Sequence, residues 1–76
     1  MMKLKELKKD DTGIVEGFTS ADPAYRQKLL RMGLNRGAEF LVVRKAPFGG
    51  PIEIEVKGSR VVLRSNEADA LEVDKK

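Results

Sequence analysis

Glu53 and Glu55 have the residue type and spacing of a small acidic site. Two carboxylates two positions apart on an extended segment share one face, where they could hold a divalent cation or act as general acid and base. Ile52, Ile54 and Val56 alternate with them, however, and that alternation alone predicts a strand with one buried and one hydrated face. We therefore predict no metal site, and Glu53 and Glu55 are the ligand candidates should one exist.

Two other segments resemble ligand sites in one respect each. Asp10-Asp11 offers carboxylates to a hard cation, but Thr12-Gly13 follows directly and the four residues together predict a turn. Phe48-Gly49-Gly50 has the glycines of a phosphate loop, but neither the G-x-x-x-x-G-K-[ST] nor the G-x-G-x-x-G spacing is present, so nucleotide hydrolysis is not expected. The Phe48 side chain is either an exposed interface anchor or a lid folded back on the core.

The absence of two residue types excludes most catalytic chemistry. The sequence contains no cysteine and no histidine. A thiolate nucleophile, a disulfide, a cysteine-ligated zinc or iron–sulfur site and the usual imidazole base are therefore all missing. We expect a protein that is not an enzyme, with no catalytic residue and no cofactor. Weak binding of Fe(II) or another divalent metal stays open.

Length and charge limit the remaining classes. The 76 residues allow one domain, which we place at residues 1–76. The 41% of hydrophobic residues is too high for a disordered tail. The net charge of +3 is mild, and acids lie close to most of the bases, as on an ordinary charged surface. No apolar run approaches the length of about 20 residues that spans a bilayer, and the first residues lack a secretory apolar core. We expect a cytoplasmic protein without a membrane span.

A set of basic residues is the other candidate surface. It could meet nucleic acid, an acidic protein or anionic lipid, or it could be ordinary surface. With 3 Phe and 1 Tyr, the stacking aromatics that small barrels use on nucleic acids are scarce, so we expect no nucleic-acid partner. The set comprises Arg26, Lys28, Arg31, Arg36, Arg44 and Lys45.

Short strands separated by turns dominate the expected structure. Residues 2–11 form either a short strand with a turn or one helical turn. The first main strand, at 13–18, contains Gly17, which indicates a bulge or a sharp bend. The alternating and β-branched patterns predict further strands, with a hairpin turn at Gly58-Ser59, at 38–45, 52–57, 60–64 and 71–73.

One helix is expected between the first two main strands. We expect Asp22 to be its N-cap and Pro23 its first residue. The amide hydrogen that proline lacks would have no partner within the helix at that position. Gly33 is expected to end it in a left-handed cap, with Leu34 folded back on the last turn. Ser65 is expected to cap a short helical turn before the last strand.

An open sheet of this size would expose its edges, and closure removes them. We therefore predict a mostly β fold, a small SH3-like β-barrel of about five strands. One α-helix is inserted after the first main strand, and a short helical turn precedes the last strand.

The stretch from Lys28 to Val73 resembles the FeoA family, small cytoplasmic proteins of bacterial and archaeal ferrous iron transport. The match lies in an L-R-M-G-L segment at 30–34 followed by Arg36-Gly37, and in the A-P-F-G-G-P loop at 46–51. It continues with Glu67-Ala68 before the last strand. Asp10-Asp11 departs from the family, many members of which have a Pro-Gly-type turn there.

The resemblance implies an accessory protein of the Feo system that acts by protein–protein interaction. Its expected partner is FeoB, a membrane transporter of Fe(II) with a cytoplasmic GTPase domain. We expect the partner to contact the surface around Tyr25, Arg31, Met32, Leu34 and Phe48.

Other functions stay open beside this one. The main alternative is a metal-responsive regulatory module that binds a divalent transition metal, because related SH3-like domains occur at the C-termini of iron-dependent repressors. A GTPase activator would place Arg31 or Arg36 in the nucleotide site. A nucleic-acid-binding barrel would show a steep dependence on salt. A homo-oligomer is also possible.

Overall fold

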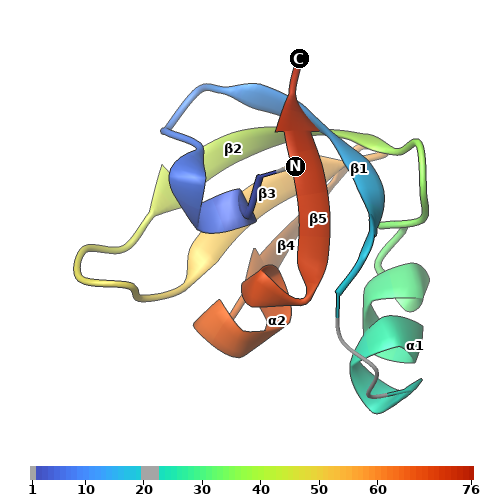
Figure 1. The fold of residues 1–76 in the computed structure, drawn as a ribbon. Coiled ribbons are helices and arrows are strands. Elements are labelled where there is room, and N and C mark those ends of the chain that lie inside the picture. Colours follow the sequence, from blue (N-terminus) through green and yellow to red (C-terminus); the bar gives the residue numbers. More distant parts are fainter. Residues whose placement is uncertain (1, 20–22) are drawn as a thin grey trace.

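Five antiparallel strands in the order β4-β3-β2-β1-β5 form one sheet in the computed structural model (Figure 1). The structure describes residues 2–19 and 23–76. The elements in chain order are a 3-10 helix η1 (Leu4–Glu6), β1 (Thr12–Phe18), α1 (Pro23–Arg31), β2 (Glu39–Lys45), β3 (Ile52–Val56), β4 (Ser59–Leu63), α2 (Ser65–Asp69) and β5 (Leu71–Lys75).

The strands follow the predicted patterns closely. β2 lies at the centre of the sheet and carries apolar residues on both faces, as its sequence requires. Every second residue of β3 is buried, and the glutamates between them are half-buried on the outer face. The register between β1 and β5 shifts between Val15 and Gly17, which is the bulge expected at Gly17. The N-terminal piece takes the helical option, as η1.

The predicted closure into a barrel is wrong. β4 and β5 are the two ends of the sheet, and no strand pairing joins them in the described residues. The short helices η1 and α2 pack against each other beside β5, and α2 also contacts β4. Leu4, Leu7 and Ala68 from this region belong to the core. Side chains of two short helices therefore fill the space between β4 and β5, here called the seam, where backbone pairing would have closed the barrel.

The two edges of the sheet are protected unequally. The amide of Met2 donates to the carbonyl of Val73 at 2.8 Å, and the amide of Val73 donates back at 2.9 Å. The N-terminus therefore covers part of the outer edge of β5. Within residues 2–19 and 23–76, no backbone group bonds the outer edge of β4 in the same way.

The end of α1 confirms the predicted glycine cap. Gly33 has φ of 89°, in the left-handed region that glycine adopts without strain. The amide of Leu34 donates to the carbonyl of Leu29 at 3.0 Å, and both leucine side chains are fully buried. Leu34 therefore belongs to the core, and its prediction as a partner contact is wrong. The expected cap Asp22 lies outside the described residues.

The β3–β4 hairpin turns one residue earlier than predicted. Val56 pairs with Ser59, so Lys57 and Gly58 form the turn, with φ of 52° and 80°. Two positive φ values are typical of the type I′ turn that suits the twist of a hairpin. This register places Val61 and Leu63 of β4 on the core side and leaves Val62 exposed, whereas a slip of one residue would exchange the two faces of β4.

α1 is fastened to α2 by polar contacts. The ammonium of Lys28 donates to the carboxylate of Glu67, which is almost fully buried and also accepts the Arg64 amide at 2.9 Å. The Asn66 side-chain amide donates to the Tyr25 hydroxyl at 2.6 Å. Chiefly because of the Lys28 hydrogen bond, the pKa of Glu67 lies below the usual glutamate range. The carboxylate is thus held in its charged form.

Replacing Glu67 by Gln should lower the free energy of unfolding at neutral pH by about 1 to 2 kcal/mol, because a charge-assisted hydrogen bond is lost. A group with a depressed folded-state pKa contributes stability above its unfolded pKa and loses it on acidification. The difference between Glu67→Gln and wild type should therefore be constant above about pH 5 and shrink as the pH falls through about 4. Urea denaturation across pH measures it, and a difference that grows in acid would contradict the assignment.

Candidate functional site

The loop between β2 and β3 presents the most exposed apolar side chain among the described residues. The amide of Ala46 donates to the carbonyl of Pro51 at 2.9 Å, which closes the loop at its base. Phe48 and Gly49, at its tip, have φ of 59° and 75°. The Phe48 side chain is fully exposed, so the structure favours the interface anchor over the lid.

The backbone of Phe48 is strained. A left-handed conformation costs a residue with a side chain about 1 to 2 kcal/mol, and a bulky residue there is a genuine outlier. No packing contact of the Phe48 ring offsets this conformational cost, because the side chain is fully exposed. Strain that the fold does not use is typical of residues that serve binding.

A pocket of about 640 Å³ opens beside the loop, between the loop and the two short helices of the seam. Its wall is mixed: apolar side chains from β3 and α2 lie beside charged ones from η1, β2 and α2. The lining residues are Lys5, Lys45, Ala46, Pro47, Phe48, Gly49, Gly50, Ile52, Ser65, Ala68 and Asp69.

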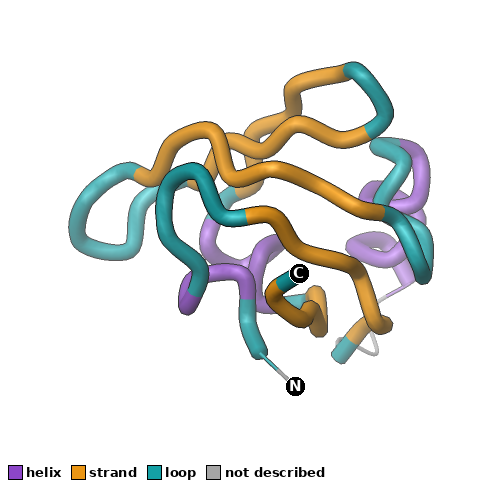
Figure 2. Tube along the Cα trace, turned by 90° about the horizontal axis from the view of Figure 1, so that it is seen from above, coloured by secondary structure: helices purple, strands orange, loops and turns teal. Residues whose placement is uncertain are grey.

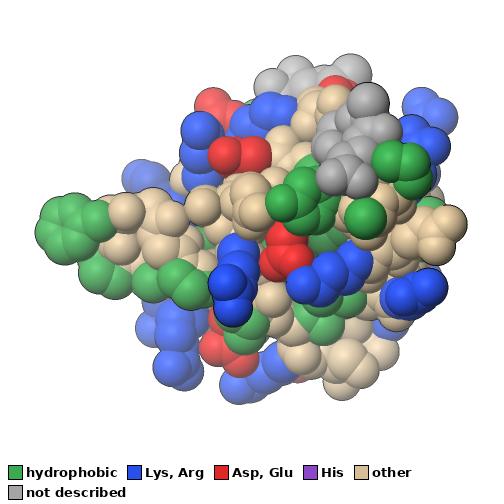
Figure 3. Space-filling view, turned by 90° about the horizontal axis from the view of Figure 1, so that it is seen from below, with side chains coloured by type: hydrophobic (Ala, Val, Ile, Leu, Met, Phe, Trp, Pro, Cys, Tyr) green, Lys and Arg blue, Asp and Glu red, His purple; other side chains and the backbone are tan. Residues whose placement is uncertain are grey.

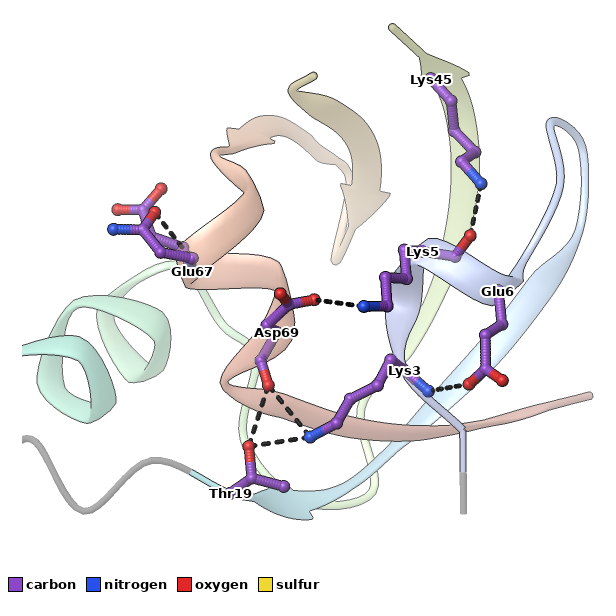
Figure 4. A network of polar contacts seen from close by, with 8 residues as sticks. Lys3, Lys5, Glu6, Thr19, Lys45, Glu67 and Asp69 are labelled. Atoms are coloured by element: carbon purple, nitrogen blue, oxygen red, sulfur yellow. Dashed lines mark hydrogen bonds and ion pairs between the residues drawn. The ribbon is translucent and has the colours of Figure 1, made fainter. Parts of the chain in front are cut away.

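A polar network holds the charged wall of the pocket in place (Figure 4). The Lys45 ammonium donates to the carbonyls of Lys5 and Leu7 at 2.6 and 2.7 Å, so it ties η1 to the end of β2. The Lys5 ammonium lies 4.0 Å from the Asp69 carboxylate. The Asp69 carbonyl accepts from the Lys3 ammonium at 3.1 Å. These lysines therefore have structural partners.

The same carbonyl of Asp69 also accepts the Thr19 hydroxyl at 2.9 Å, and Lys3 donates to Thr19 at 3.0 Å. The end of β1 is thus joined to η1 and α2 (Figure 4). Hydrogen bonds thus connect the elements that form one wall of the pocket, which helps the pocket to keep its shape for a side chain of a partner.

The two carboxylates predicted as metal-ligand candidates each lie near an arginine. Among residues 2–19 and 23–76, no three potential ligands among Asp, Glu, His and Cys come together to hold a metal ion. Glu53 lies 3.5 Å from the Arg44 guanidinium, and Glu55 lies 4.0 Å from that of Arg60. Each candidate carboxylate thus faces an arginine, an arrangement that opposes a cation between them.

The turn predicted at residues 10–13 lies earlier, at Lys9-Asp10, and β1 already begins at Thr12. The Asp11 carboxylate accepts the Lys8 amide at 2.8 Å, and Lys75 lies 3.5 Å from it. The Lys8 hydrogen bond, helped by Lys75, holds the pKa of Asp11 below its usual range. Asp10 has φ of 73°, a conformation that aspartate tolerates in turns.

The structure does not bring the predicted partner contacts into one surface. Figures 1 and 2 place the 46–51 loop and α1 at opposite ends of the molecule. Phe48 therefore stands apart from Tyr25, Arg31 and Met32. Tyr25 is half-buried and bonded to Asn66, and Met32 packs against the core, whereas Arg31 is exposed. The prediction of a single contact region joining these residues is wrong.

The predicted set of basic residues is spread over the surface, and most of its side chains interact with an acidic, aromatic or carbonyl group of the chain itself. In the space-filling view, lysines and arginines lie on several sides of the body, while an apolar tip formed by the 46–51 loop projects at one end (Figure 3). Arg26 stacks 5.8 Å from the centre of the Phe18 ring. Lys28 and Arg44 pair with glutamates. The set therefore does not form one patch.

Sequence reasoning missed the pocket. Lys5, Lys45 and Asp69 lie far apart in the chain, and only the packing of η1 against α2 brings them together. No local pattern in the sequence indicates that these three residues lie together.

The described chain contains no helix with the length and apolar character needed to cross a bilayer.

Known proteins resemble the chain along its whole length. A family model described as FeoA domain matches residues 2–75. A crystal structure of an iron uptake regulatory protein (FeoA) is 36% identical, with a TM-score of 0.89 over 99% of this chain and 97% of that one. The NMR structure of the FeoA protein from Chlorobium tepidum is 43% identical, with a TM-score of 0.86 over 97% and 70%.

A third similar structure is the zinc complex of FeoA from Stenotrophomonas maltophilia, described as a prokaryotic SH3 domain protein. It is 32% identical, with a TM-score of 0.83 over 97% of this chain and 91% of that one. These likenesses confirm the predicted SH3-like fold, although the sheet of this chain is open.

Replacing Phe48 by Asn should raise the free energy of unfolding by about 1 kcal/mol, because asparagine tolerates a positive φ and no packing is lost. Phe48→Ala is the matched control, since alanine keeps the backbone cost, and its stability should equal that of wild type. Thermal and urea denaturation measure both. A destabilised Phe48→Asn variant would show that the ring contributes to the fold.

Proposed function

The chain belongs to the FeoA family, and from this we propose that it serves Fe(II) uptake as a non-enzymatic accessory protein that binds a protein partner. The family supports the link to ferrous iron transport. The absence of cysteine and histidine supports a role in binding rather than catalysis. We further propose a cytoplasmic location, as for the family.

The single observation that carries the proposal is the exposed Phe48 on a strained, closed loop. Aromatic side chains that lie in water before association release much apolar surface when a partner covers them, and they dominate the affinity of many interfaces. The closed loop base restrains the backbone that carries the ring, so less conformational entropy of the loop is lost on binding.

The partner that fits is a FeoB-type membrane transporter of Fe(II), through its cytoplasmic side. The proposed contact consists of the Phe48 ring and the adjoining pocket, which would receive a partner side chain. Arg31 at the opposite end, the exposed member of the α1 group, would belong to a second contact if the partner reaches around the molecule.

Metal binding is not part of the proposal. Although a similar FeoA structure is a zinc complex, the carboxylates Glu53 and Glu55 of this chain are each opposed by an arginine. We propose iron only as the cargo of the transport system.

Phe48→Ala should weaken binding to a FeoB-type transporter about tenfold, because a central aromatic anchor is lost, while the melting temperature stays unchanged. Binding is measured with the purified chain immobilised and the detergent-solubilised transporter in solution, with and without GTP. Lys76→Ala is the control, since it removes an exposed side chain at the C-terminal end, away from both the 46–51 loop and α1. Its affinity should stay within about twofold of wild type.

Arg31→Ala in the same assay reports whether the contact extends to α1. Equal affinities for wild type and Phe48→Ala would refute the loop as the contact, and failure of wild type to bind the transporter would refute the partner.

A further inference from the structure

The outer edge of β4 is an unpaired strand edge with a defined pattern of hydrogen-bonding groups. Val56 and Ser59 close the two-residue hairpin turn, so they form a hydrogen-bonded pair. Pairs alternate along an antiparallel ladder, which makes Ile54 and Val61 the next bonded pair. The amides and carbonyls of the residues between, Arg60 and Val62, therefore point away from β3.

These outward groups have no backbone partner in the described chain. The hydrogen bonds made outside the regular ladders include none from Arg60 or Val62. The corresponding edge of β5 is bridged by Met2. Exposed edges are usually blocked, because they invite pairing with another strand. On β4 the side chains of Arg60 and Val62 are exposed as well, Val62 at 56%.

The side chains that β4 itself exposes are basic and apolar, whereas Glu53 and Glu55 of the neighbouring strand β3 lie opposite Val62 and Arg60. Arg60, Val62 and Arg64 are exposed at alternate positions, and the strand Ser59–Leu63 contains no acidic residue. Arg60 faces Glu55 across the strands at 4.0 Å, and Arg64 interacts electrostatically with Glu67, but both arginine side chains stay exposed. The edge therefore presents two cations that flank one apolar side chain.

A shallow apolar pocket continues from Val62 toward the Phe48 loop. Its volume is about 370 Å³. It connects the β4 edge to the base of the loop proposed as the partner anchor, so one bound segment can contact both. Its lining residues are Arg44, Lys45, Ala46, Pro47, Pro51, Glu53 and Val62.

We propose that the free edge of β4 binds an extended acidic segment of a partner protein, which adds to the sheet as a sixth strand. The segment has an apolar residue opposite Val62 and acidic residues two positions away on either side, opposite Arg60 and Arg64. Backbone hydrogen bonds give the affinity, and the alternate side chains give the specificity. This inference rests on the proposed function only in taking the segment to belong to the same partner.

A second copy of this chain is a poor occupant of the edge. Two β4 strands paired with each other would bring the arginines of both copies together without any acidic residue from either strand. Like charges opposite each other destabilise a strand pair, whereas opposite charges stabilise it. Charge complementarity therefore selects an acidic partner segment.

The test is an NMR titration of the isotope-labelled full chain with the synthetic peptide TETVTET at low ionic strength. The amide signals of Arg60 to Arg64 should move, and the Val62 amide should become protected from exchange. The peptide TKTVTKT is the charge-reversed control and should not bind.

Two variants separate backbone pairing from charge attraction. Val62→Pro removes an outward amide and leaves the ladder to β3 intact, so it should abolish binding. Arg60→Glu should weaken binding about fivefold. Lys76→Glu, a single charge reversal beyond β5, is the matched control and should bind as wild type does.

The proposal is overturned if TETVTET does not bind wild type, if Val62→Pro binds it equally well, or if the shifts map to the pocket at Lys5 and Asp69. Concentration-dependent dimerisation that Val62→Pro abolishes would assign the edge to a second copy and would also overturn it. Since this assay contains no transporter, failure here leaves the Phe48 result standing, and failure of the Phe48 assay leaves this one standing.

Discussion

The open seam between β4 and β5 determines the rest of the structure. Burial of Leu4 and Leu7 contributes about 3 to 6 kcal/mol together, at about 1.5 to 3 kcal/mol for each leucine. Each backbone hydrogen bond that β4–β5 pairing would add is worth about 1 kcal/mol net. Leu4 and Leu7, from η1 and the residue that follows it, lie in the space between the strands together with Ala68 of α2. The free energy gained by burying these side chains is therefore comparable to that of the backbone pairing which would close the barrel. Lys45 and Asp69 then fix both helices there.

Both proposed binding surfaces follow from this arrangement. The two short helices η1 and α2 form one wall of the pocket beside the Phe48 loop. The missing pairing leaves the outer edge of β4 without a partner, while the N-terminus covers that of β5. A closed barrel would have had neither feature. Both proposed contacts with a partner therefore depend on the sheet being open between β4 and β5. The positive charge of Arg60 and Arg64 then favours an acidic segment at the β4 edge.

Local patterns in the sequence predicted most of the elements. The alternation at 52–56, the glycine cap at Gly33 and the bulge at Gly17 each depend on neighbouring residues, and each is present. Closure failed as a prediction because it depends on how residues 4–7 pack against 65–69, which no local pattern records. The same limit applies to the site: the loop was visible from its glycines and prolines, but its distance from α1 and the pocket beside it were not. Leu34 was mistaken for a surface residue because its apolar side chain fits both roles.

Hydrogen exchange of the β4 backbone amides, followed by NMR on the free full chain, tests the open seam most directly. The amides of Val61 and Leu63, which bond to β3, should exchange slowly, while those of Arg60 and Val62 should exchange at least about a hundredfold faster because water reaches them. Slow exchange of all four amides, together with cross-strand contacts between β4 and β5, would show a closed barrel and contradict the account.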